Sequence, residues 1–191
     1  IVEVVHRAFP EPVPYIDRAS MISSYPKKSI FMSSWGMADY YAKDERIMRG
    51  ILEGDQPPFL IANRRMLALD RLEEDEFGPE HLGFFREDRD ILQDNYIRHW
   101  GPIFVAGKRF VLDRDAASKT FEILVAGEYQ LQSVENVVID GQILEPGGTL
   151  DLAQGAHQIT VGKAGEYVLR WGHNLYKPSG KSPDKPVFTD F

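Results

Sequence analysis

The sequence predicts an α+β fold, in which a small α/β unit with a short parallel sheet precedes a small antiparallel β-sandwich. In the first 101 residues, short apolar runs alternate with stretches of helical periodicity. The dipeptide Gly101–Pro102 then marks a boundary. After it, short strand-like runs are separated by glycine turns. We therefore predict an α/β unit over 1–101, a sandwich over 102–175 and a mobile, proline-rich tail over 176–191.

The composition narrows the classes of function. The chain has 22 basic and 29 acidic residues and a net charge of −7, which disfavours nucleic acid as a partner because phosphate binding needs clustered Lys and Arg. There is no cysteine, so disulfides, thiolate metal sites and cysteine nucleophiles are excluded. No window approaches the roughly 20 apolar residues of a membrane span. The chain begins at Ile1, and we interpret it as a processed protein or a piece of a longer one.

The segment Ser29–Tyr40 organises the predicted α/β unit. Its apolar run Ile30–Met32 predicts a buried strand, which ends at a Ser-Ser-Trp-Gly corner. Apolar residues then recur at helical spacing up to Ile51, which predicts an amphipathic helix. Pro57–Pro58 introduces a second buried strand, Phe59–Asn63. We expect the two strands to be parallel and joined by a right-handed connection.

The flanking segments are less regular. The run Ile1–His6 is either a first strand or a lead-in, and the segment Tyr15–Tyr25 predicts a short helix. The acidic stretch over 70–76 is interpreted as a solvated face, with a metal site as the alternative. One or two helices are expected from Pro79 to Trp100.

The second half of the chain has the pattern of a sandwich. Ile103–Leu112 predicts a strand, a turn and a strand, and Asp140–Gly141 predicts a tight hairpin turn. Glycine-containing turn signals separate the remaining strands at nearly regular intervals. These strands are expected over 121–125, 128–132, 137–139, 142–144, 149–152, 157–161 and 166–171.

A binding cleft is predicted where the two parallel strands end. Polar and aromatic side chains from the strand ends, from the following helix and from the helix that closes the unit could line it, a composition suited to a sugar or a lipid-linked sugar head group. The candidate binding residues are Ser34, Trp35, Asp39, Asn63, Tyr96, His99 and Trp100. The alternative is that both tryptophans are core residues and that the rim is a capped helix end.

No catalytic residue, metal site or cofactor is predicted. Ser34 resembles a nucleophile elbow in outline, but the elbow needs a glycine two residues before the serine, and Met32 stands there. A serine at this corner is interpreted as a helix N-cap. The five histidines form no HxH or HExxH pair.

Several segments together resemble the soluble C-terminal region of bacterial polytopic glycosyltransferases of the GT-C class, of the dolichyl-phosphate-mannose or undecaprenyl-phosphate-sugar type. The resemblance covers the chain from about Pro12 to Trp171. The segments are Pro14-Tyr-Ile-Asp-Arg, Ser33-Ser-Trp-Gly-Met, Pro57-Pro-Phe-Leu-Ile-Ala-Asn, Asn95-Tyr-Ile-Arg-His-Trp-Gly-Pro, the late Ile-Asp-Gly and Gly-Ala-His-Gln-Ile runs, and Leu169-Arg-Trp-Gly.

The resemblance implies a non-catalytic fragment on the periplasmic side of the inner membrane, because the loops that carry the acidic base in that class are absent. Its partners would be the rest of the parent membrane protein and a sugar or a lipid-linked sugar head group. Two alternatives stay open. One is a free-standing periplasmic or secreted carbohydrate-binding protein with the sandwich as its recognition module, and the other is a small hydrolase that uses Ser34.

Overall fold

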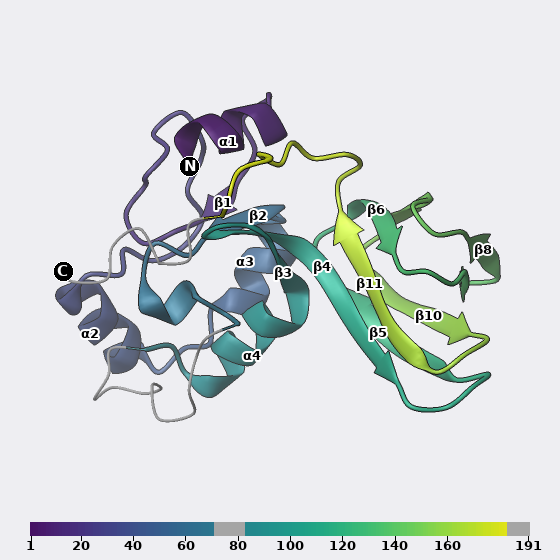
Figure 1. Ribbon diagram of the computed structural model, residues 1–191. Coiled ribbons are helices and arrows are strands. Elements are labelled where there is room, and N and C mark those ends of the chain that lie inside the picture. Colours follow the sequence, from purple (N-terminus) through teal and green to yellow (C-terminus); the bar gives the residue numbers. More distant parts are fainter. Residues whose placement is uncertain (71–82, 183–191) are drawn as a thin grey trace.

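The computed structural model describes residues 1–70 and 83–182, and these residues form an α+β fold (Figure 1). The helices are α1 (Val2–Ala8), α2 (Ser34–Lys43), α3 (Met48–Asp55) and α4 (Arg86–Asn95), with a 3-10 turn η1 (Arg65–Leu67). The strands are β1 (Tyr15–Ile16), β2 (Phe59–Ile61), β3 (Tyr96–Trp100), β4 (Ile103–Leu112), β5 (Ser118–Ile123), β6 (Gly127–Gln132), β7 (Val137–Ile139), β8 (Gln142–Leu144), β9 (Thr149–Leu152), β10 (Gly155–Val161) and β11 (Gly165–Trp171).

The strands form two sheets. A seven-stranded mixed sheet has the order β1-β2-β4-β11-β6-β9, and β3 also pairs with β4. Its parallel pair is β1 with β2, in which Tyr15 lies opposite Phe59. The second sheet is antiparallel, with the order β5-β10-β7-β8. The fold class predicted from the sequence is therefore confirmed.

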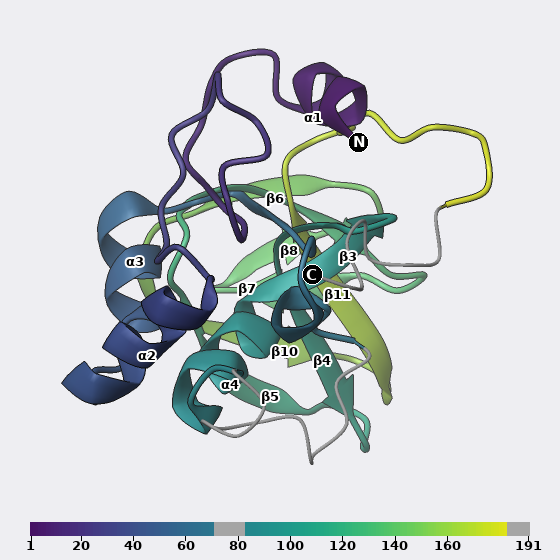
Figure 2. The same ribbon diagram turned by 90° about the vertical axis from the view of Figure 1, so that its left-hand side faces the viewer.

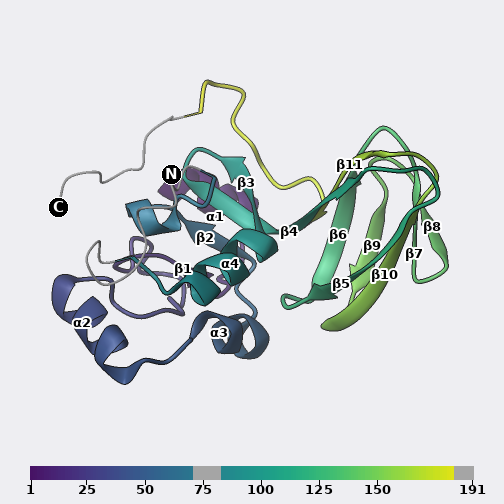
Figure 3. The ribbon, with the colours of Figure 1, turned by 90° about the horizontal axis from the view of Figure 1, so that it is seen from below.

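Strand β4 belongs to both halves of the molecule. Its first residues pair with β2 and β3, and its segment Gly107–Leu112 pairs with β11. We call the described part of residues 1–101, which contains all the described helices, the helical unit. Figure 3 shows β4 and β11 running from the helical unit into the sandwich. The predicted boundary at Gly101–Pro102 lies in the turn between β3 and β4, so one sheet continues across it.

The apolar side chains form three clusters. One lies among α2, α3, α4 and the sheet and includes Met37, Leu52 and Leu92. Another fills the space between the two sheets of the sandwich, and the third lies under α1. Trp171 packs against all three clusters, so this residue links the core of the helical unit to that of the sandwich.

Helix α3 is capped by a side chain from another helix. Its N-cap residue Ile47 has no side chain that could accept a hydrogen bond. Instead, the buried carboxylate of Asp88 in α4 accepts from the backbone N–H of Ile47 at 3.1 Å and of Met48 at 3.0 Å. The Tyr40 hydroxyl donates to the same carboxylate at 2.8 Å. Asp88 therefore joins α2, α3 and α4 around one buried group.

The predicted strand over Ile30–Met32 is wrong. The backbone N–H of Ser33 donates to the carbonyl of Phe31 at 2.8 Å, so the chain turns tightly here instead of extending along a neighbour. The parallel partner of β2 is β1, which comes from the segment Tyr15–Tyr25 that the sequence predicted as a helix. After β1, the carboxylate of Asp17 accepts from two following backbone N–H groups and stabilises a turn.

Four other predicted elements differ. The predicted helix up to Ile51 is broken into α2 and α3 at Asp44, which has a positive φ of 50°. The run Ile1–His6 lies at the start of helix α1, which covers Val2–Ala8, so the predicted alternative of a first strand is wrong. The last residues of the segment predicted to be helical up to Trp100 form strand β3. The segment Ile103–Leu112 is one continuous strand without the predicted turn.

The later strands are confirmed, because each predicted run from 121 to 171 corresponds to one of β5 to β11. The acidic stretch over 70–76 and the start of the helix predicted from Pro79 lie largely outside the described residues. Residues 183–191 of the predicted tail also lie outside them. Within the described part of the chain, no helix is both long and apolar enough to span a bilayer.

Candidate functional site

The carboxyl ends of β1 and β2 lie side by side, because the two strands are parallel neighbours. Asp17 and Arg18 follow β1, and Asn63 and Arg64 follow β2 after Ala62. The amide of Asn63 joins the two ends: its oxygen accepts from the backbone N–H of Arg18 at 2.9 Å, and its Nδ2 donates to Asp17 at 3.3 Å. Asn63 is buried, so it fixes the shape of this rim.

The start of α2 reaches the same rim. The backbone N–H of Met32 donates to the carbonyl of Arg18 at 3.2 Å, and the guanidinium of Arg64 donates to the carbonyl of Met32. Ser33, the N-cap of α2, accepts from the backbone N–H of Gly36 at 3.2 Å. Three segments far apart in sequence are therefore hydrogen-bonded together. We call this arrangement the strand-end rim, made of Asp17, Arg18, Met32, Ser33, Ser34, Trp35, Asn63 and Arg64.

The strand-end rim carries two arginines, Arg18 and Arg64, whose positive charges affect each other. Burial, the larger cause, and the like charge of Arg18 both lower the pKa of Arg64 from its ordinary value, although an arginine side chain is not deprotonated in proteins. The guanidinium of Arg18 makes no hydrogen bond or ion pair with the described residues. Two neighbouring guanidinium groups, one of them without a partner, form a local environment suited to an anion.

Aromatic side chains are exposed on either side of Met32, whose carbonyl accepts from Arg64. Trp35 is 71% exposed and Phe31 is 49% exposed. The alternative in which Trp35 is a core residue is therefore wrong. Figure 2 shows α2 at the outer edge of the helical unit, away from β3. An indole ring on this edge is free to stack on a ligand.

Two other predicted residues lie on α2. Ser34 is exposed, and in the described residues no histidine or carboxylate is hydrogen-bonded to its hydroxyl, so it lacks the base that a serine nucleophile needs. The cap of α2 is Ser33 and not Ser34. Asp39 is exposed and pairs with Lys43 at 2.8 Å, as an ordinary i,i+4 pair on a helix surface.

The predicted residues Tyr96, His99 and Trp100 do not lie at a helix end but on strand β3. Tyr96 is buried, and its hydroxyl donates to the carbonyl of Pro57 at 2.6 Å. Trp100 is half-buried and packs in the cluster under α1, and its indole N–H is buried without a partner in the described residues. These side chains serve the packing around β3 and are not part of the strand-end rim.

His99 sits in a separate hydrogen-bonded group. Arg170 donates to its Nδ1 at 2.8 Å, so the ring proton is on Nε2, which lies 2.9 Å from the carbonyl of Tyr176. The side chain is only 5% exposed. Burial is the main cause that lowers the pKa of His99 to about 4, and the nearby charge of Arg170 acts in the same direction. The imidazole is neutral at pH 7 and holds the segment after β11 against β3.

Ser34 and Trp35 follow the Met32 segment, which is hydrogen-bonded to Arg18 and Arg64, and Asn63 lies at the end of β2. Tyr96, His99 and Trp100 lie on strand β3, apart from these segments. The sequence analysis did not identify Arg18 and Arg64. A signal existed for Arg64, since it directly follows Asn63 at the predicted end of a strand. No such signal was available for Arg18 once its segment was predicted to be helical.

Comparison of the chain with protein-family models, with curated proteins and with solved structures finds no match. No group of three or more potential metal ligands occurs among the residues that the structure describes. The function is therefore argued from the geometry of the strand-end rim.

Proposed function

We propose that the chain is a non-catalytic extracytoplasmic domain of a polytopic membrane glycosyltransferase and that its strand-end rim positions the head group of a polyprenyl-phosphate sugar. The observation that carries the proposal is the pair Arg18 and Arg64, whose second member binds the carbonyl of Met32 three residues before the exposed Trp35. A lipid-linked sugar has a phosphate next to a sugar ring, so guanidinium and indole groups match the two halves of this ligand.

The rim also lacks what catalysis of transfer would need. Its one buried carboxylate, Asp17, accepts hydrogen bonds from backbone N–H groups and from Asn63, and these bonds hold it in a turn. Ser34 has no general base, as described above. The resemblance to the soluble region of GT-C enzymes agrees with a domain that binds or positions a ligand while another part of the parent protein carries the chemistry.

The test is binding of a short-chain isoprenyl-phosphate sugar to the 191-residue chain, compared with the same sugar without phosphate. We expect Arg18→Gln to weaken binding of the phosphate compound about tenfold, because a charged hydrogen bond contributes about 1.5–3 kcal/mol. Arg114→Gln is the matched control, since Arg114 is exposed in the turn after β4, outside the strand-end rim. Equal binding of the two sugars would contradict phosphate recognition and favour a free-standing carbohydrate-binding protein.

Trp35→Ala separates binding from folding. Because the indole is 71% exposed, its removal should change the free energy of unfolding by less than about 0.5 kcal/mol while it weakens sugar binding several-fold. The unmodified 191-residue chain should not transfer sugar from the phosphate donor to an acceptor. Appreciable turnover by this chain alone would refute the non-catalytic role.

A further inference from the structure

A pocket outside the strand-end rim shares no residue with it. This pocket, of about 390 Å³, opens between the segment that follows α1 and the end of β11. Its apolar wall is formed by Phe9, Val13, Trp171 and Leu175. In Figure 1 the chain leaving β11 runs back to α1, so the two walls come from opposite ends of the chain.

The aromatic wall is held in place from several sides. Phe9 stacks on Phe59 at a centroid distance of 4.5 Å and on Trp171 at 6.0 Å. The indole N–H of Trp171 donates to the carbonyl of Ala126 at 3.0 Å. A β-carbon at Gly127 would collide with the indole, so glycine at this position leaves room for the ring. The pocket is therefore built on a fixed aromatic surface.

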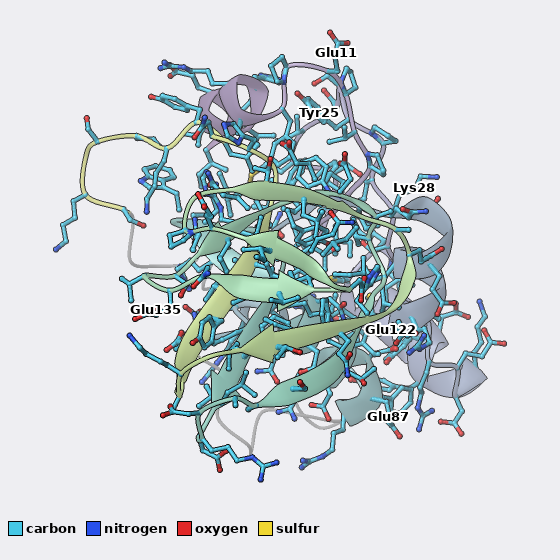
Figure 4. The ribbon with its side chains drawn as sticks, turned by 90° about the vertical axis from the view of Figure 1, so that its right-hand side faces the viewer. Glu11, Tyr25, Lys28, Glu87, Glu122 and Glu135 are labelled. Carbon is cyan, nitrogen blue, oxygen red and sulfur yellow. The ribbon has the colours of Figure 1, made fainter. Side chains whose placement is uncertain are left out.

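Acidic groups supply the charge of the pocket. Glu11, on the loop after α1, and Glu128, on β6, both line it. Neither carboxylate makes a hydrogen bond or an ion pair with the residues that the structure describes. No lysine or arginine lines the pocket, and His173 is its other titratable lining residue. Figure 4 shows Glu11 at one end of the molecule, well away from Glu135, a carboxylate on the sandwich.

We propose that this pocket binds an organic ammonium ion that carries an apolar or aromatic group. The carboxylates of Glu11 and Glu128 supply negative charge for the ammonium group, and the face of Trp171 can add a cation–π contact. The apolar part of the ligand fills the space between Phe9, Val13 and Leu175. This inference is independent of the proposed function, because it shares no residue with the strand-end rim.

The test uses three small probes of similar shape: 2-phenylethylammonium, neutral 2-phenylethanol and anionic phenylacetate. Binding is measured by calorimetry and by chemical-shift changes in NMR spectra of the whole chain. We expect the cation to bind with a dissociation constant in the millimolar range or tighter, the neutral probe to bind more weakly, and the anion not to bind. Affinity for the cation should fall as salt is added.

The variant Glu11→Gln/Glu128→Gln should weaken binding of the cation about tenfold and leave binding of 2-phenylethanol unchanged. Glu135→Gln is the matched control, because Glu135 is a carboxylate on the sandwich that pairs with Lys163 at 2.6 Å. Thermal unfolding of each variant shows whether it is folded.

Three results would overturn the proposal: equal affinity for the cation and the alcohol, equal loss of affinity in the Glu135→Gln control, or shift changes that map to residues outside the pocket. A lack of detectable binding at about 10 mM probe would also overturn the proposal, because the binding free energy would then be weaker than about 3 kcal/mol.

Discussion

The carbonyl oxygen of Phe31 occupies the space that a β-carbon at position 36 would need. An ideal β-carbon built on Gly36 collides with this oxygen, which is a backbone atom and cannot swing aside. The close approach follows from the tight turn at Ser33, whose backbone N–H donates to Phe31 and whose side chain caps α2. Glycine at position 36 therefore permits the corner that brings α2 to the strand-end rim.

Gly36→Ala should destabilise the protein by about 1–3 kcal/mol, because the corner has to open to admit the methyl group. Gly50→Ala is the control. Gly50 lies within α3 with no atom close to the site of its missing β-carbon, so alanine there should stabilise the helix by about 0.5–1 kcal/mol. Urea denaturation measures the free energy of unfolding of both variants. Equal effects of the two substitutions would contradict a close approach at Phe31.

Loss of the Asp88 carboxylate should strongly destabilise the protein. Asp88→Ala removes one acceptor that serves two backbone N–H groups and the Tyr40 hydroxyl, and it leaves these donors buried. We expect a loss of about 2–4 kcal/mol in the free energy of unfolding. Asp94→Ala, at an exposed position of the same helix, should change it by less than about 0.5 kcal/mol. A similar small effect of both variants would show that Asp88 does not hold the three helices together.

His99 should make the protein less stable in mild acid. Its folded pKa of about 4 lies below the ordinary value of 6.5, so between these pH values the unfolded chain binds a proton that the folded chain does not. Above pH 6.5 the imidazole of His99 is neutral in both the folded and the unfolded chain, so its titration does not change the free energy of unfolding. As pH falls through the window from 6.5 to 4, stability is lost, up to about 3 kcal/mol.

The control for this effect is His99→Gln, which has no titratable ring. The difference in unfolding free energy between the protein and this variant should change between pH 6.5 and 4. His157 acts in the opposite direction. Burial is the largest single effect and opposes protonation of His157, but the hydrogen bonds to Asp140 and Ala153 and the charge of Asp140 together outweigh it and raise the pKa. The contribution of His157 is therefore present below the unfolded pKa and is lost as pH rises through the folded one. An NMR titration that places the His99 pKa near 6.5 would contradict the prediction.

The strands after β4 were predictable because local turn chemistry determines them, whereas the glycine inside Ile103–Leu112 suggested a turn that does not exist. At Asp140–Gly141, φ is 49° and 83°, which is the pair of positive values that a two-residue hairpin requires and that this dipeptide favours. Positive φ values also occur at Ala116, Gly127, Gly147 and Gly155, next to β5, β6, β9 and β10. Prediction therefore needed no knowledge of distant contacts.

The first half was harder because tertiary contacts decide it. The two-residue strand Tyr15–Ile16 is too short to show any periodicity, and it exists because β2 lies beside it. Ile30–Met32 has the composition of a strand but no strand partner, and its middle residue Phe31 is half exposed. The place of Asn63 could be predicted from the end of an apolar run. That of Arg18 could not, since it depends on recognising β1.

The last prediction concerns the unfolding of the two halves. Because β4 pairs with β2 and β3 at one end and with β11 at the other, neither half keeps its sheet when the other unfolds. Trp171 also packs against the core clusters of both halves. We expect a single calorimetric transition whose calorimetric enthalpy equals its van't Hoff enthalpy.

Gly107, where the two pairing regions of β4 meet, offers a way to perturb this junction. A β-carbon there would lie 2.8 Å from the carbonyl oxygen of Leu169 and crowd the side chain of Ile97. Gly107→Ala should therefore cost about 1–3 kcal/mol and shift the whole transition to lower temperature without splitting it. Gly162→Ala, at a position with open space for the methyl group, is the control and should leave the midpoint nearly unchanged. Two separate transitions, in either the unmodified protein or the Gly107 variant, would show that the halves unfold independently despite their shared strand.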